Sequence, residues 1–147
     1  MLRRRLTMGS SPSRDSFRPP VSAVFVAVGD VVILAAFVVL GLLMHQISPT
    51  SHPVYAIQTA LPFLLAWLIV APIVGAYASR TLRSVRRTLG VASLAWIVVS
   101  VLGAGIRATP FFHGGAPVEF VLVNLVVGLG FVLSWRILVA VSIPRLT

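Results

Sequence analysis

The chain has 147 residues, of which 58% are hydrophobic and only 10% are charged. A soluble domain of this length carries about a quarter charged residues, so this composition is typical of a protein whose solvent is lipid. Lys and Arg together number 12 against 3 for Asp and Glu, the net charge is +9, and all twelve basic residues are arginine. The absence of lysine and cysteine excludes Schiff-base chemistry on lysine, thiolate catalysis, disulfide bonds and cysteine-ligated metal sites.

The excess of arginine suggests an acidic partner, either nucleic acid or a membrane surface. The arginines lie beside apolar runs that are long enough to span a bilayer, where anionic lipid head groups are the nearest partner. We therefore expect contact with anionic lipid head groups at the cytoplasmic face and no nucleic-acid partner.

The first twenty residues carry five arginines among Ser and Pro, with too few apolar residues to fold independently. We interpret residues 1–20 as a flexible basic cytoplasmic tail. A charged start before an apolar run also occurs in signal peptides. The run after Pro20 is longer than the apolar region of a signal peptide, and no small-residue cleavage site follows it. We therefore expect an uncleaved first helix.

Four apolar stretches follow, and each meets the requirement of about 20 residues for a membrane-spanning helix. They cover residues 21–44, 54–77, 88–109 and 118–141, and the segments 45–53, 79–87 and 110–117 between them are interpreted as loops. The sequence therefore predicts an all-α protein, a four-helix transmembrane bundle with up-down topology. Its single transmembrane domain covers residues 21–141, and a short tail of residues 142–147 follows.

The arginines also predict the orientation, because short loops that carry arginine stay on the cytoplasmic side during insertion. The N-terminal segment has five arginines, the C-terminal tail has Arg145, and the opposite side has only Arg107. The loop after the second helix holds a basic cluster of four, namely Arg80, Arg83, Arg86 and Arg87. We therefore expect both termini and this basic cluster in the cytoplasm.

Asp30 and Arg136 form the first candidate charge pair inside the membrane. Asp30 lies nine residues into the first stretch, about 14 Å from the cytoplasmic end. Arg136 lies about 8 Å from the same surface in the last stretch, and its long side chain can cover the difference in depth. The functional interpretation is a proton or ion site. The structural interpretation is a salt bridge, or a neutral hydrogen-bonded Asp, that fixes the register of two helices.

Arg107 and Glu119 form the second candidate pair, since one leaves the third helix and the other enters the fourth at a matching depth near the outer surface. The helix face that carries Arg107 also holds a mostly small-residue stripe, which favours close helix packing over a pore. The stripe consists of Ser93, Trp96, Ser100 and Gly103.

Motifs of catalysis and cofactor binding do not stand out. The sequence has no G-x-S-x-G, no H-E-x-x-H and no phosphate-binding glycine loop. His45, His52 and His113 are expected on the outer side, but their spacing matches no metal signature, so we interpret them as exposed loop residues. We predict a non-catalytic protein with no catalytic, cofactor-binding or metal-ligating residues.

A combination of short motifs resembles a known family. The motifs are Gly29-Asp30 in the first helix, Trp67 with Pro72 and Gly75-Ala76-Tyr77 at the end of the second, Arg107-Ala108-Thr109-Pro110 after the third, and Phe120 with Trp135-Arg136 in the fourth. Over roughly residues 22–139 the chain resembles the uncharacterised membrane family called domain of unknown function 3054, which occurs in actinobacteria and haloarchaea. The resemblance implies a multi-pass protein of a prokaryotic plasma membrane, without an assigned activity, substrate or cofactor.

These observations leave two main hypotheses for function. The first is a non-catalytic membrane subunit or scaffold, whose partner is another membrane protein or a second copy of the chain. The alternative is a small transporter or channel, as an oligomer, that uses the intramembrane charges of Asp30 and Arg136. An enzyme acting on a lipid has the least support, because no pair of nucleophile and base is visible.

Overall fold

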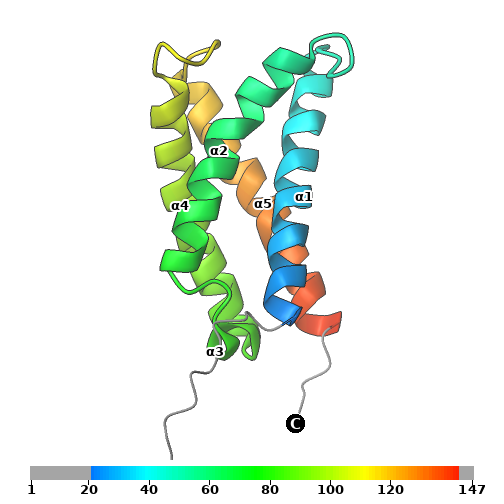
Figure 1. Cartoon of the computed structure of the whole chain (residues 1–147), viewed down its shortest axis with the longest axis vertical. Coiled ribbons are helices and arrows are strands. Elements are labelled where there is room, and N and C mark those ends of the chain that lie inside the picture. The colour runs from blue at the N-terminus through cyan, green and yellow to red at the C-terminus, as the bar shows by residue number, and fades with distance from the viewer. Residues whose placement is uncertain (1–20, 143–147) are drawn as a thin grey trace, which may run out of the picture.

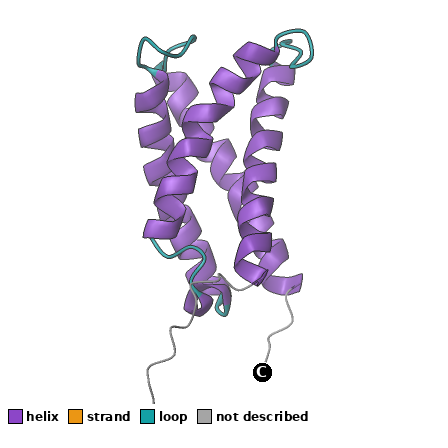
Figure 2. Ribbon diagram, in the orientation of Figure 1, coloured by secondary structure: helices purple, strands orange, loops and turns teal. Residues whose placement is uncertain are grey.

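The computed structural model describes residues 21–142 of the chain. Its elements, in chain order, are α1 (Val21–Met44), α2 (Pro53–Ile73), α3 (Ser79–Leu82), α4 (Val85–Arg107) and α5 (Val118–Ser142). The four long helices run alternately up and down and are joined by short loops, and the described residues contain no strand (Figures 1 and 2). All four are long and apolar enough to cross a membrane, so the predicted all-α bundle of four spans is confirmed.

Both ends of the described chain lie at the end of the bundle where α3 connects α2 to α4 (Figure 1). We call this the α3 end and the other the far end. The predicted tail at residues 1–20, Arg145 and most of the predicted tail at 142–147 lie outside the described residues. Ser142 is an exception, because α5 continues one residue beyond the predicted boundary.

Helix α2 ends at Ile73, four residues before the predicted boundary at Tyr77. The chain turns at Gly75, which adopts a left-handed φ of 76° that glycine takes without steric cost. The N–H of Ala76 donates to the carbonyl of Ala71 at 2.9 Å, and that of Gly75 donates to Pro72 at 3.0 Å. This is the Schellman pattern that ends helices, so the apolar run after Ile73 forms a turn instead of a further helical turn.

The segment 79–87, predicted as a loop, contains the single helical turn α3 and the beginning of α4. Helix α4 begins three residues before the predicted boundary because Ser84 caps it, accepting a hydrogen bond from the N–H of Arg87 at 3.4 Å. The Thr88 hydroxyl donates to the carbonyl of Thr81 at 2.7 Å and joins α3 to α4. The four arginines of the basic cluster are exposed on this connection.

The core lies between the long helices and contains two fully buried tryptophans, Trp67 and Trp96, with ring centroids 6.3 Å apart. Three glycines receive an aromatic ring from a neighbouring helix, so that a methyl group added at any of them would overlap that ring. The pairs are Gly29 with Trp135, Gly103 with Phe63, and Gly128 with Trp96. These contacts set how closely the helices approach, as small residues commonly do in membrane bundles.

Candidate functional site

Asp30 of α1 and Arg136 of α5 lie in direct contact. The Arg136 Nη2 atom is 2.6 Å from Asp30 Oδ2, and Nε donates to Oδ1 at 3.1 Å. This two-pronged geometry is the one in which a guanidinium matches a carboxylate best. The contact forms because α1 and α5 are neighbours that cross closely at Gly29 and Trp135, the residues that precede the two charges.

Three further groups complete what we call the Asp30 cluster. The Tyr77 hydroxyl donates to Asp30 Oδ2 at 2.7 Å, and Trp67 Nε1 donates to the same hydroxyl at 3.0 Å. Arg136 Nη1 donates to the carbonyl of Ala76 at 3.1 Å. Ala76 and Tyr77 reach the cluster because α2 has ended at Ile73 and the chain turns beneath the bundle. The cluster therefore joins α1, α5 and the end of α2.

The cluster is closed to its surroundings. Arg136 is 0% exposed and Asp30 3% exposed. Within residues 21–142, no side-chain nitrogen or oxygen atom of the cluster is buried without a hydrogen-bond partner. The Arg136 guanidinium also lies 5.3 Å from the ring centroid of Tyr77 and 5.9 Å from that of Trp67, at cation–π distance. A buried ion pair with this complete set of partners resists removal of either charge.

The turn that carries Tyr77 lies outside the four spans, and burial together with the Asp30 carboxylate raises the pKa of Tyr77 well above its usual range. The phenol therefore stays protonated and serves as a donor to Asp30. Sequence reasoning named the two charges but did not assign Trp67 or Tyr77 to them. A signal was available, because a buried Trp N–H or Tyr O–H normally requires a polar partner.

Arg107 and Glu119, the second predicted pair, do not meet. Glu119 is exposed in the first turn of α5, whereas Arg107 is 3% exposed, and the described residues contain no ion pair between them. Arg107 instead points into the bundle, with its Cζ atom 5.0 Å from the ring centroid of Phe120 and 5.9 Å from that of Tyr55. The prediction of this pair was wrong because matching depth does not fix the helix face on which each residue lies.

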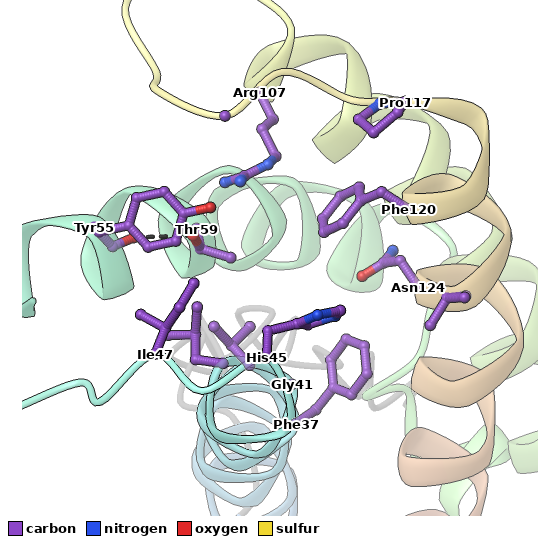
Figure 3. Close-up of a pocket in the computed structure, with 14 residues that line it drawn as sticks. Phe37, Gly41, His45, Ile47, Tyr55, Thr59, Arg107, Pro117, Phe120 and Asn124 are labelled. Atoms are coloured by element: carbon purple, nitrogen blue, oxygen red, sulfur yellow. Dashed lines mark hydrogen bonds between the residues drawn. The ribbon is translucent and has the colours of Figure 1, made fainter.

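Arg107 enters a cavity of about 340 Å³ at the far end of the bundle (Figure 3). The residues around it come from all four long helices, from the loop between α1 and α2 and from the loop before α5. They include Phe37, Leu42, His45, Tyr55, Phe120 and Asn124. We call this cavity the Arg107 pocket.

The small-residue stripe of α4 packs against neighbouring helices. Ser100 and Gly103 are buried, and Ser100 accepts a hydrogen bond from Asn124 of α5 at 3.3 Å. The predicted preference for packing over a pore agrees with these contacts.

The three histidines lie in the loops that join the long helices. The Nδ1 atom of His113 lies 3.0 Å from Oε1 of Gln58, and residues 21–142 contain no group of three His, Asp or Glu side chains able to hold a metal ion.

The comparison with known families agrees with the resemblance inferred from the motifs. The sequence profile of a family described as "Protein of unknown function (DUF3054)" matches residues 27–139. No match is found among curated proteins or among solved structures. The matched range contains Asp30, Arg107 and Arg136 together with most of the four-helix bundle. The chain therefore belongs to the DUF3054 family.

Proposed function

We propose that this chain is a non-catalytic subunit or scaffold of the plasma membrane, which binds another membrane protein through the outer surface of its bundle. The closed Asp30 cluster carries this proposal. A carboxylate that passes protons or ions needs water or a second partner during its cycle, and intramembrane charges of that kind face a wet path. Asp30 faces Arg136 and Tyr77 instead, so its geometry favours a structural role over the alternative of a transporter.

The surface of α5 supports the same proposal. Its buried residues form one narrow stripe, so most of its circumference faces outward. Gly130 and Ser134 are exposed one helical turn apart, and a methyl group added at Gly130 would meet no atom of the described chain within 4 Å. A small-xxx-small pair on an outward face lets a second helix approach closely, which is the usual geometry of helix association in membranes.

The basic cluster extends the proposal to the lipid surface. Arg80, Arg83, Arg86 and Arg87 are exposed at the α3 end, where anionic head groups of the cytoplasmic leaflet would attract them. Each such arginine near an anionic surface contributes about 1 kcal/mol to the attraction. In this proposal the cluster holds the α3 end at the cytoplasmic face.

Affinity purification of the tagged chain from its native membrane in a mild maltoside detergent tests the subunit role. We expect a membrane protein to copurify in a fixed molar ratio, and Gly130→Leu to lose it. The matched control is Gly105→Leu, at another exposed glycine with no atom within 4 Å of an added methyl group, but on α4. The control should retain the partner, and neither variant should lower the thermal midpoint below that of the wild-type chain.

A flux assay tests the alternative. The purified chain in liposomes with an internal pH indicator should show no proton flux above that of empty liposomes. Flux that Asp30→Asn abolishes would contradict the proposal and favour a transporter. Loss of the partner in both glycine variants would contradict a specific interface on α5.

A further inference from the structure

We propose that the Arg107 pocket is a binding site for an amphiphilic anion, in which a carboxylate or phosphate group binds Arg107 and an apolar body fills the remainder of the cavity. The site lies at the opposite end of the bundle from the Asp30 cluster. It is independent of the subunit role proposed above.

The first observation is a buried cation that has no counter-charge within residues 21–142. Arg107 is 3% exposed, and its Nε and Nη1 atoms have no hydrogen-bond partner within residues 21–142. The two carboxylates of the described residues do not serve it, because Asp30 is paired with Arg136 and Glu119 is exposed with no ion pair. An arginine stays protonated in proteins, so its charge must be compensated by a partner. The rings of Tyr55 and Phe120 attract the cation through their faces, but a ring face does not replace an oxygen acceptor for the Nε and Nη1 hydrogens.

The second observation is the space in front of this cation. The guanidinium points into the cavity between Tyr55 and Phe120 (Figure 3). A cavity of about 340 Å³ lies at the lower end of the range for small-molecule sites, which is roughly 300–1,000 Å³. Exposed lining residues such as His45 and Pro117 show that the cavity reaches the surface at the far end. A small molecule can therefore enter from that side.

The third observation is the arrangement of the donors. Gly114, with a φ of 115°, lets the guanidinium lie directly against the loop before α5, since a methyl group there would overlap Arg107 and lie 3.4 Å from the Tyr55 hydroxyl. The Arg107 guanidinium and the Tyr55 hydroxyl therefore lie close together in the lining of the pocket. Two donors of this kind suit the oxygen atoms of a carboxylate or phosphate.

The walls determine the rest of the ligand. Phe37, Leu42 and Phe120 line the cavity with hydrocarbon, and the Thr59 hydroxyl already donates to the carbonyl of Tyr55 at 2.9 Å. One cation among apolar walls selects a ligand with one anionic group and an apolar body. An anionic lipid of the surrounding leaflet and a water-soluble amphiphile from outside both have this chemistry.

Three probes separate the contribution of the anionic group from that of the apolar body. Octanoate has both an anionic group and a hydrocarbon tail, whereas octanol has only the tail and acetate has only the anionic group. With the purified full-length chain in a neutral maltoside detergent, thermal unfolding followed by tryptophan fluorescence should show stabilisation by octanoate. Octanol and acetate should require at least roughly tenfold higher concentration for the same shift, since hydrogen bonds to a charged group contribute about 1.5–3 kcal/mol.

Arg107→Gln should weaken octanoate binding by roughly tenfold or more, because a neutral amide replaces the cation. His52→Gln, at an exposed residue of the far end that does not line the pocket, is the control and should bind octanoate as the wild-type chain does. Mass spectrometry of extracts from the untreated protein then identifies the source. An anionic lipid at one per chain, absent from Arg107→Gln, assigns a lipid, whereas octanoate binding without such a lipid assigns a soluble amphiphile, and both support the site.

Equal stabilisation by octanol and octanoate would overturn the proposal, as would unchanged octanoate binding in Arg107→Gln. The absence of both octanoate binding and a retained lipid would overturn it as well. The comparison of octanoate with octanol uses the wild-type chain alone, so it decides the matter even if Arg107→Gln does not fold.

Discussion

Arg136 and Asp30 are held together by two parallel contacts, from Nη2 to Oδ2 at 2.6 Å and from Nε to Oδ1 at 3.1 Å, although 106 positions separate them in the chain. Each residue is nearly inaccessible to solvent. Removal of one partner therefore leaves the other as an unpaired charge inside the bundle.

Mutual dependence of the two charges is the first prediction. Asp30→Leu and Arg136→Leu should each lower the stability of the detergent-solubilised chain by on the order of 3–5 kcal/mol, because each strands a buried charge. The double variant should recover much of this loss, since two apolar side chains of similar size can replace a buried pair nearly neutrally. Thermal unfolding of the four proteins measures the coupling. Losses that simply add would show that the two side chains act independently.

Protonation of Tyr77 gives a pH prediction. The raised pKa means that the folded chain holds the phenolic proton more tightly than the unfolded chain, in which tyrosine titrates near pH 10. The resulting contribution to stability is complete below about pH 10 and is lost as the pH rises above it. The chain has two tyrosines, so Tyr55→Phe leaves Tyr77 as the single phenol for an absorbance titration. Tyrosinate formation at the ordinary pH of a free phenol, in the folded protein, would refute the buried hydrogen bond to Asp30.

Loss of the Tyr77 hydroxyl should also be measurable at neutral pH. Tyr77→Phe removes one hydrogen bond to Asp30 and leaves Trp67 Nε1 without its acceptor. The expected loss is about 1–3 kcal/mol, because a buried donor is left unsatisfied. Thermal unfolding provides the measurement, with Tyr55→Phe as the matched control at a tyrosine outside the cluster. A larger loss of stability in Tyr55→Phe than in Tyr77→Phe would contradict the expected contribution of the Asp30 cluster to stability.

Two glycines of α5 provide a matched test of the packing. Gly128→Leu should destabilise the chain by about 1–3 kcal/mol or more, because its side chain would overlap the indole of Trp96. Gly130→Leu should be neutral or slightly stabilising, since no atom of the described chain lies near and leucine has the higher helix propensity. The two variants share helix, depth and substitution. Equal melting temperatures would contradict the close contact between α4 and α5.

The orientation remains a prediction from the arginine distribution. Single cysteines at Ser11, Ser84 and His113 can be placed in this cysteine-free chain and treated with a membrane-impermeant thiol reagent on intact cells. Only the cysteine at position 113 should react, because arginine-rich segments stay on the cytoplasmic side. Reaction at position 11 or 84 with none at 113 would reverse the assignment.

The sequence alone determined the number of spans and which charged side chains are unfavourable inside a bilayer, because both depend on local properties of the chain. Runs of apolar residues are long enough to satisfy their backbone groups as helices. A charge within such a run, as at Asp30 or Arg136, is conspicuous without knowledge of the fold. The end of α2 could also have been predicted from the local sequence, since a glycine such as Gly75 commonly follows the last turn of a helix.

Tertiary structure decided which of these residues meet. Arg107 and Glu119 have matching depths but lie on different helix faces, and the rotation of α4 and α5 about their axes turns Arg107 inward toward Tyr55 while Glu119 faces outward. That rotation follows from the packing of Phe63 of α2 on Gly103 of α4 and of Trp96 of α4 on Gly128 of α5. The depth of a residue in the bilayer depends on its own helix alone. Contact between residues of two helices depends also on how both helices are rotated, which the shapes of the side chains between them decide.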